Sequence, residues 1–365
     1  MISNPPKRTW RLISNSVIGS SHKLSGKPNQ DRINFFPSCK YPEDLPIIFT
    51  IADGHGGKKY FRSERGANFA VETAIEVCKN QLENTSWDSI KGKKIKDGIC
   101  RDIFRKWLEK VHADIQENPF SDEEIELIQP KNNTITKTPW LINNDYNVFA
   151  YGSTLLIVII HESYILFLQL GDGDILVITS DGTIDRPIPD DDRLIGNETT
   201  SLCLPEAWSE FKFKLSEISH NSPFPALILM STDGYKNSFS EETGFEKVGS
   251  DLLSIICEHP EGIHEGIDSI EDNLADWLNL ASEKGSGDDT TVGLILNLDQ
   301  IKKYRDKNYD ISIRKKKQDQ KESINASSES IVEQIRLNSN EIKSEISDTQ
   351  FDNKMIEENS SVDQL

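Results

Sequence analysis

The chain has 365 residues, of which 36% are hydrophobic and 28% charged, enough apolar material for one large domain or two small ones. Its formal net charge of −19 argues against nucleic acid as a main partner, because a phosphate backbone repels an acidic protein. The longest apolar run, Leu155 to Ile160, has only the length of a strand, so we expect no membrane span. The first ten residues lack the apolar stretch of a secretory signal.

Apolar runs predict buried strands, and apolar residues recurring every three or four positions predict helices. The expected elements, in chain order, are strand Pro46–Ala52, helices Gly66–Leu82 and Cys100–Gln116, strands Ser153–Ile160, Tyr164–Leu170, Asp174–Thr179 and Ala226–Ser231, helix Glu265–Glu283, and strand Thr290–Asn297. This order predicts an α+β fold in which packed sheets are covered by helices.

The composition divides the chain into a domain over residues 1–299 and a charged, low-complexity tail over 300–365. Within the tail, 302–321 holds nine basic and three acidic residues, and 322–365 holds three basic and ten acidic residues. Such blocks indicate a flexible or partly helical extension. Two interpretations stay open for it: a solvated tail, or a partner-binding helix whose face carries Ile331, Ile335, Ile342 and Ile346.

The five cysteines are an odd number and form no CxxC motif. They are Cys39, Cys78, Cys100, Cys203 and Cys257. We expect reduced cysteines in a cytoplasmic protein rather than a disulfide framework.

Aspartates stand at the tips of apolar strands at four places. Asp53 and Asp233 follow such runs, Asp172 follows another, and Asp288 with Asp289 precedes the last. Each alone is more typical of a turn. If they converge, their like charges need a cation, and oxygen ligands suit Mg²⁺ or Mn²⁺.

The Asp53–Gly57 segment, DGHGG, carries the most specific chemistry. Asp53 has two oxygens with which to bridge two cations, and Gly54 can bring its carbonyl to one of them. His55 stands beside the site as a candidate to protonate a leaving oxygen, although a lone histidine is often only a structural hydrogen-bonding group.

With these motifs in hand, the chain resembles the PPM (type 2C) family of metal-dependent serine/threonine protein phosphatases, with a segment at His22–Asp31 similar to bacterial members. The resemblance covers roughly residues 10–298. The matching motifs are Asn29-Gln30-Asp31, Asp53–Gly57, Gly152-Ser153-Thr154, Gly171-Asp172, Asp233-Gly234 and Asp288-Asp289-Thr290-Thr291. It implies a four-layer α/β/β/α sandwich of two antiparallel sheets flanked by helices.

The resemblance also implies roles for individual residues. Two cations, Mn²⁺ or Mg²⁺, would be held by Asp53, Gly54, Asp233 and Asp288, and Asp31 would orient a water. That water, activated by the metals as hydroxide, would attack phosphorus while His55 protonates the leaving oxygen. Of the remaining matched positions, Thr154 would line the site as a candidate phosphate-binding residue, and Asp172 and Asp289 would support the metal ligands.

Three positions depart from the family pattern. Gly26 occupies the place of a phosphate-binding arginine, and we expect Lys27 or His22 to substitute, although each could equally be a surface residue. Gln30 replaces a glutamate, and Asn237 stands where many members have an aspartate tied to a further metal, which puts that metal in doubt.

Three functions remain open at this point. The first is a phosphatase that acts on phosphorylated proteins, opposed by a serine/threonine kinase. The alternatives are a catalytically weak regulatory or binding module with the same fold, and a phosphatase of small phosphorylated metabolites. Two polar stretches, 118–148 and 186–225, are long for loops. The second holds Asp190–Asp192 and apolar Leu202, Leu204 and Trp208, and it could equally be a substrate flap or a structural lobe.

Overall fold

The computed structural model describes residues 9–84, 95–128, 145–189, 199–219 and 224–307. The first compact unit of the chain runs to Arg305. Most of the predicted tail, including the candidate partner-binding helix, lies outside the described residues.

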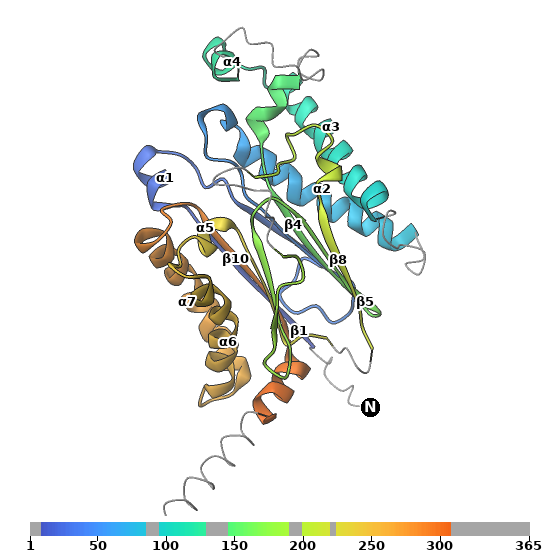
Figure 1. Cartoon of the computed structure of the whole chain (residues 1–365), viewed down its shortest axis with the longest axis vertical. Helices are drawn as coiled ribbons and strands as arrows, with labels where there is room; N and C mark the ends of the chain where they lie inside the picture. The colour runs from blue at the N-terminus through green and yellow to red at the C-terminus, as the bar shows by residue number, and fades with distance from the viewer. Residues whose placement is uncertain (1–8, 85–94, 129–144, 190–198, 220–223, 308–365) are drawn as a thin grey trace, which may run out of the picture. The chain divides into compact units, whose positions relative to one another are not determined.

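Ten strands form two five-stranded sheets in which every pairing is antiparallel (Figure 1). One sheet has the order β1 (Trp10–Val17), β10 (Thr290–Asn297), β9 (Leu227–Ser231), β6 (Asp174–Ile178) and β7 (Ile184–Asp185). The other has the order β2 (Arg32–Phe36), β3 (Ile47–Ala52), β4 (Leu155–His161), β5 (Tyr164–Leu170) and β8 (Lys212–Glu217).

Helices cover the outer face of each sheet (Figure 1). Helices α2 (Ser63–Asn84) and α3 (Arg101–Glu117) pack against the β2–β8 sheet, and α6 (Glu242–Glu258) and α7 (Ile263–Lys284) pack against the β1–β7 sheet. A third core, which includes Phe49 and Met230, lies between the sheets. These three apolar layers confirm the predicted four-layer sandwich.

Short helices fill the connections. They are α1 (Ser20–Ser25), α4 (Asp122–Ile128) and α5 (Asp233–Lys236), with 3₁₀ segments at Lys58–Tyr60, Asp145–Tyr151 and Ala207–Ser209 and a π-helical segment at Ile95–Cys100. Residues 298–307 continue from β10 as a helix, and Ile301 in it is fully buried against the α6–α7 layer.

None of the described helices combines the length and apolarity that crossing a bilayer requires. All five cysteines are free.

The register of the strands brings the motif residues to one end of the sandwich. Arg32 at the start of β2 pairs with Ala52 at the end of β3, so the flanking Asp31 and Asp53 are neighbours. In the other sheet, Ser231 at the end of β9 pairs with both Asp174 and Val292. The tips of both sheets therefore meet where the aspartates stand.

Candidate active site

Close backbone approach fixes the loop that carries Asp53. A Cβ atom on Gly54 would lie 2.7 Å from the carbonyl oxygen of Ser63 and 2.8 Å from that of Gln30, so only glycine fits. The Asp53 N–H donates to the hydroxyl of Thr154 at 3.0 Å, and the Thr154 N–H donates to the Asp53 carbonyl at 2.8 Å. Thr154 is buried and positions the Asp53 backbone, so this arrangement gives no support to the expected phosphate contact.

Asp31 connects the two sheets. Its Oδ2 accepts hydrogen bonds from the hydroxyl groups of Thr232 at 2.9 Å and Thr291 at 2.6 Å, both in the β1–β7 sheet layer. Its Oδ1 is buried and has no hydrogen-bond partner among the described residues. Burial, and then the charges of Asp289 and Asp233, raise the pKa of Asp31 to about 8 despite the two hydroxyl groups.

The carboxyl groups of Asp53 and Asp233 interact, and each shifts the pKa of the other. Burial and the charges of Asp31, Asp233 and Asp288 hold the pKa of Asp53 well above its usual range. Burial and the charge of Asp172 raise the pKa of Asp233 to about 6.

Asp172 completes the group of converging carboxyls. Burial raises its pKa, an effect opposed by a hydrogen bond from the Thr199 side chain and by the charge of Lys236. Its neighbour Asp174 is buried and is paired instead with two cations, Lys236 Nζ at 3.0 Å and Arg186 Nε at 3.1 Å. Lys236 thus brings a positive charge to the edge of the cluster, three residues after Asp233.

Asp288 and Asp289 have different surroundings although they are adjacent. Asp289 is buried and accepts hydrogen bonds from the N–H groups of Gly19 and Gln30, each at 2.6 Å. Asp288 is exposed and bonds the Asp289 N–H at 2.8 Å. A Cβ on Gly234 would lie 2.0 Å from the Asp289 carbonyl oxygen, so glycine lets the Asp233 turn approach this pair.

The two expected substitutes for the arginine, Lys27 and His22, have different surroundings. The Lys27 ammonium donates to the carbonyl of Gly56 in the DGHGG loop, and the residue is half-buried. His22 is buried and faces Asp288 and Asp289, so its expected role as a phosphate ligand finds no support in these contacts.

His55 lies against the ring of Tyr60, with 4.7 Å between ring centroids. Burial and the charge of Lys59 lower its pKa to about 4. The imidazole is therefore neutral at pH 7 in the metal-free protein. Acting as a proton donor requires that the negative charge of a bound phosphate raise its pKa.

The site fits divalent cations. Four carboxyl groups have raised pKa values because they are desolvated next to one another, and one oxygen of Asp31 is buried without a partner. Crowded carboxylates and an unpartnered buried oxygen are both unfavourable. A hard cation with oxygen ligands relieves both, because it neutralises the negative charges and binds the free lone pairs. The donor set is entirely oxygen, as Mg²⁺ and Mn²⁺ prefer.

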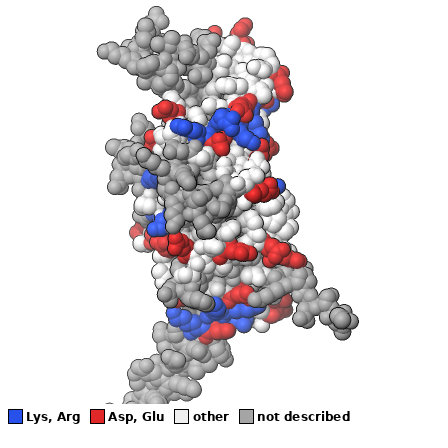
Figure 2. All heavy atoms as spheres, turned by 90° about the vertical axis from the view of Figure 1, so that its right-hand side faces the viewer, with Lys and Arg blue, Asp and Glu red and all other residues white. Residues whose placement is uncertain are grey.

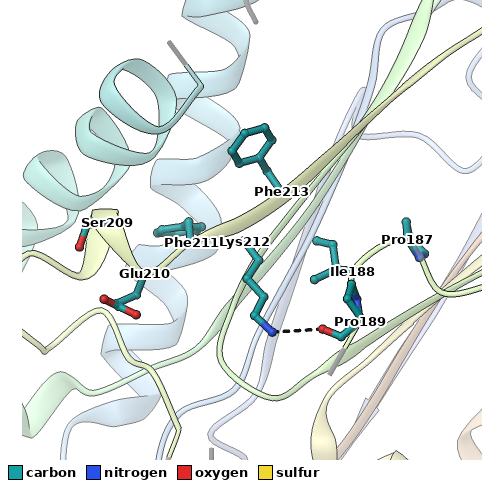
Figure 3. A pocket seen from close by; sticks show the side chains of 8 residues that line it. All are labelled: Pro187, Ile188, Pro189, Ser209, Glu210, Phe211, Lys212 and Phe213. Atoms are coloured by element: carbon teal, nitrogen blue, oxygen red, sulfur yellow. Dashed lines mark hydrogen bonds between the residues drawn. The ribbon is translucent and has the colours of Figure 1, made fainter. Parts of the chain in front are cut away.

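A cavity of about 390 Å³ lies elsewhere and is not lined by these aspartates (Figure 3). Its lining residues are Pro187, Ile188, Pro189, Ser209, Glu210, Phe211, Lys212 and Phe213, and Lys212 donates to the Pro189 carbonyl at 3.1 Å. This cavity belongs to the predicted flap, whose acidic run lies outside the described residues. In its described part Leu202 is buried and Arg101 stacks on the Trp208 ring at 4.0 Å, contacts that favour the alternative of a structural lobe for that part.

Sequence reasoning missed the polar residues that support the aspartates. Thr232 directly precedes Asp233, and Thr291 is the last residue of the Asp288–Thr291 motif. Their closeness to the motifs in the sequence could have identified them as partners of Asp31. For Asp174, its place two residues after Asp172 was a comparable signal. Nothing in the sequence indicated that Arg186 pairs with it.

Comparison with known proteins gives the family. Residues 18–279 match the family model described as protein phosphatase 2C. No curated protein matches the chain.

Several solved structures align with most of the chain, but at low sequence identity. The Stp1 serine/threonine phosphatase from Staphylococcus aureus is 13% identical, with a TM-score of 0.45, covering 78% of this chain and 94% of that one. The Mycobacterium tuberculosis phosphatase PstP/Ppp is 15% identical, with a TM-score of 0.44, covering 79% and 99%. A PstP catalytic domain solved with two manganese ions is 16% identical, with a TM-score of 0.43, covering 79% and 98%.

The sequence match spans well over half of the chain and includes most of the motif residues placed above. The family assignment rests on this sequence match alone, because the TM-scores of the solved structures are low. The chain belongs to the protein phosphatase 2C family, and it is accordingly a metal-dependent serine/threonine protein phosphatase.

Proposed function

We propose that the aspartate cluster binds two divalent cations, Mn²⁺ or Mg²⁺, and that the site hydrolyses phosphoserine and phosphothreonine in proteins. The observation that carries this proposal is the convergence of Asp31, Asp53, Asp172 and Asp233, whose carboxyl groups raise one another's pKa values, with one oxygen of Asp31 buried without a hydrogen-bond partner among the described residues. Carboxyl groups that crowd one another in this way are stabilised by a cation that neutralises their charges.

In this proposal the cations are held by four groups. Asp53, the carbonyl oxygen of Gly54, Asp233 and Asp288 would hold them. Asp31, fixed by two hydroxyl groups, keeps one unpartnered oxygen with which to orient a water. Asp289 holds the Gly19 and Gln30 backbone, and Asp172 adds charge at the rim.

When bound, the cations supply a water that ionises near neutral pH and neutralise charge on the phosphoryl oxygens. The chain's own groups do the rest. Lys27, held on Gly56, takes the place of the missing arginine in binding phosphate. His55, in the same loop, donates a proton to the departing serine or threonine oxygen once the bound phosphate has raised its pKa.

The acidic surface supports a protein substrate over nucleic acid. On the face shown in Figure 2, basic side chains occur among acidic ones and form no continuous basic surface. Two salt bridges between helices α2 and α3 show this mixture: Glu72 pairs with Lys110, and Glu76 pairs with Lys106. A phosphorylated protein and its opposing kinase remain the proposed partners, and no observation favours a small metabolite.

The test is release of phosphate from a phosphothreonine peptide by the full chain, with and without Mn²⁺ or Mg²⁺. Asp53→Asn and Asp233→Asn should each lower kcat/KM by about a thousandfold, since metal stabilisation of the transition state is worth several kcal/mol. Asp251→Asn, on the exposed face of α6, is the matched control and should retain activity. Metal-independent turnover, or wild-type rates in either site variant, would disprove the proposal.

A further inference from the structure

One histidine and two aspartates form a cluster beside the proposed metal centre. Within the described part of the chain, His22, Asp288 and Asp289 are the group whose candidate ligand atoms all lie within 4.8 Å of one another. His22 Nδ1 is 3.0 Å from Oδ2 of Asp289, and Nε2 is 3.8 Å from Oδ1 of Asp288. Of the three, the proposed function uses only Asp288 as a metal ligand.

The backbone around His22 places its ring against the aspartates. Helix α1 is tied to the segment before β10, because the Gly19 N–H donates to Asp289 and the Ser21 N–H donates to the Gly287 carbonyl at 2.9 Å. The His22 side chain is only 9% exposed. Its Nδ1 is buried and forms no hydrogen bond with the described residues, which is uncommon for a buried polar atom.

The donor set of this cluster differs from that of the main site. A neutral imidazole supplies one nitrogen lone pair, and both carboxylates keep lone pairs beyond the backbone N–H groups that they accept. Imidazole nitrogen is a good ligand for Mn²⁺ or Zn²⁺, whereas Mg²⁺ strongly prefers oxygen. The cluster therefore discriminates between ions that the all-oxygen site accepts alike.

We propose that His22, Asp288 and Asp289 form a further divalent-cation site, which binds a transition-metal ion such as Mn²⁺ or Zn²⁺ in preference to Mg²⁺. Asp288 is the shared ligand between this ion and the proposed metal centre. Its side chain is 53% exposed and that of Asp289 only 3%, so the ion enters from the Asp288 side and is then held against buried groups.

The test measures metal binding rather than turnover. The full chain is loaded with Mn²⁺, and nitrogen coupling to the ion is recorded by pulsed electron paramagnetic resonance. Bound Zn²⁺ and Mg²⁺ are counted by equilibrium dialysis with elemental analysis. His22→Gln removes the nitrogen ligand, and His55→Gln is the matched control because His55 is the other histidine near the aspartates. Thermal unfolding confirms that both variants are folded.

We expect ¹⁴N coupling in the wild type and in His55→Gln but not in His22→Gln. His22→Gln should also bind one Zn²⁺ fewer, or bind it at least about tenfold more weakly, with Mg²⁺ binding unchanged. Absence of nitrogen coupling in the wild type would overturn the inference, as would coupling that persists in His22→Gln. If the protein binds two ions and is fully active, but no bound ion depends on His22, the His22 site is disproved and the proposed function still stands.

Discussion

At the scale of single residues, the site depends on carboxyl groups whose placement is unfavourable in the absence of a cation. Asp53, Asp172 and Asp233 were predictable because each follows an apolar strand, which is a rigid support. Asp31 was found only through its motif. The contact of His22 with Asp288 and Asp289 was not predictable, because it joins the two ends of the domain and depends on how α1 packs.

Gly54 gives a sharp test of how tightly the site is built. In Gly54→Ala the new methyl group would overlap two backbone carbonyl oxygens, neither of which can rotate away. We expect the change to destabilise the fold by about 1–3 kcal/mol and to lower activity at least tenfold by displacing Asp53. Thermal unfolding and peptide turnover measure the two effects.

Gly56→Ala is the control for this prediction. Its Cβ would be 3.6 Å from His22 Nε2, an ordinary contact, so stability and activity should stay close to those of the wild type. Equal losses in both variants would show that the loop tolerates no side chain at all and that close approach at Gly54 is not the reason.

His55 can be tested through the leaving group. An alkyl oxygen such as that of threonine needs a proton as it departs, whereas an aryl oxygen needs little. His55→Ala should therefore slow a phosphothreonine peptide by about a hundredfold and an aryl phosphate by much less. His112→Ala, exposed on α3, should slow neither. Equal slowing of both substrates by His55→Ala would remove the proton-donor role.

At the scale of elements, the sequence predicted the interior strands and missed the edges. All six interior strands, β3, β4, β5, β6, β9 and β10, appear as continuous apolar runs because both of their faces are covered. The four edge strands, β1, β2, β7 and β8, are short or carry polar side chains that reach solvent. Helix α6 was missed because Gly244 and Gly249 interrupt its pattern.

The helix that follows β10 was also missed, and it supports a prediction about truncation. Ile301 is fully buried and Tyr304 packs against the same core, although both fall in the segment assigned to the charged tail by composition. A chain ending at residue 299 should lose about 2–5 kcal/mol of stability, the usual cost of removing a buried isoleucine. A chain ending at 307 keeps these contacts and should unfold like the full chain. Similar melting temperatures for the two truncations would contradict the packing of Ile301.

At the scale of the whole molecule, the active site is also the place where the two sheets are tied together. Asp31 precedes β2 of one sheet, while its hydrogen-bond partners Thr232 and Thr291 belong to the β9 and β10 side of the other. Cations bound between Asp53 and Asp233 would connect the same two sheets. Metal binding should therefore stabilise the fold as well as enable catalysis.

The raised carboxyl pKa values make this stabilisation depend on pH. In the metal-free protein, burial raises the pKa of Asp31 from its ordinary value of 3.8 to about 8, so between these two pH values the folded state binds more protons than the unfolded state. Stability must then fall as the pH rises through this range. His55, with its lowered pKa, acts in the opposite direction only below about pH 6.5.

We therefore expect the melting temperature of EDTA-treated protein to fall between pH 6.5 and pH 8.5 by several degrees, since each kcal/mol is worth about 2–4 °C in a domain of this order. Mn²⁺ should raise the melting temperature most at pH 8.5 and flatten the dependence, because the cations replace the bound protons. Asp31→Asn, which cannot ionise, should reduce the slope in the metal-free protein, whereas Asp251→Asn on α6 should not. A metal-free melting temperature that is constant or rises across this window would mean that the aspartates do not crowd one another as the structure places them.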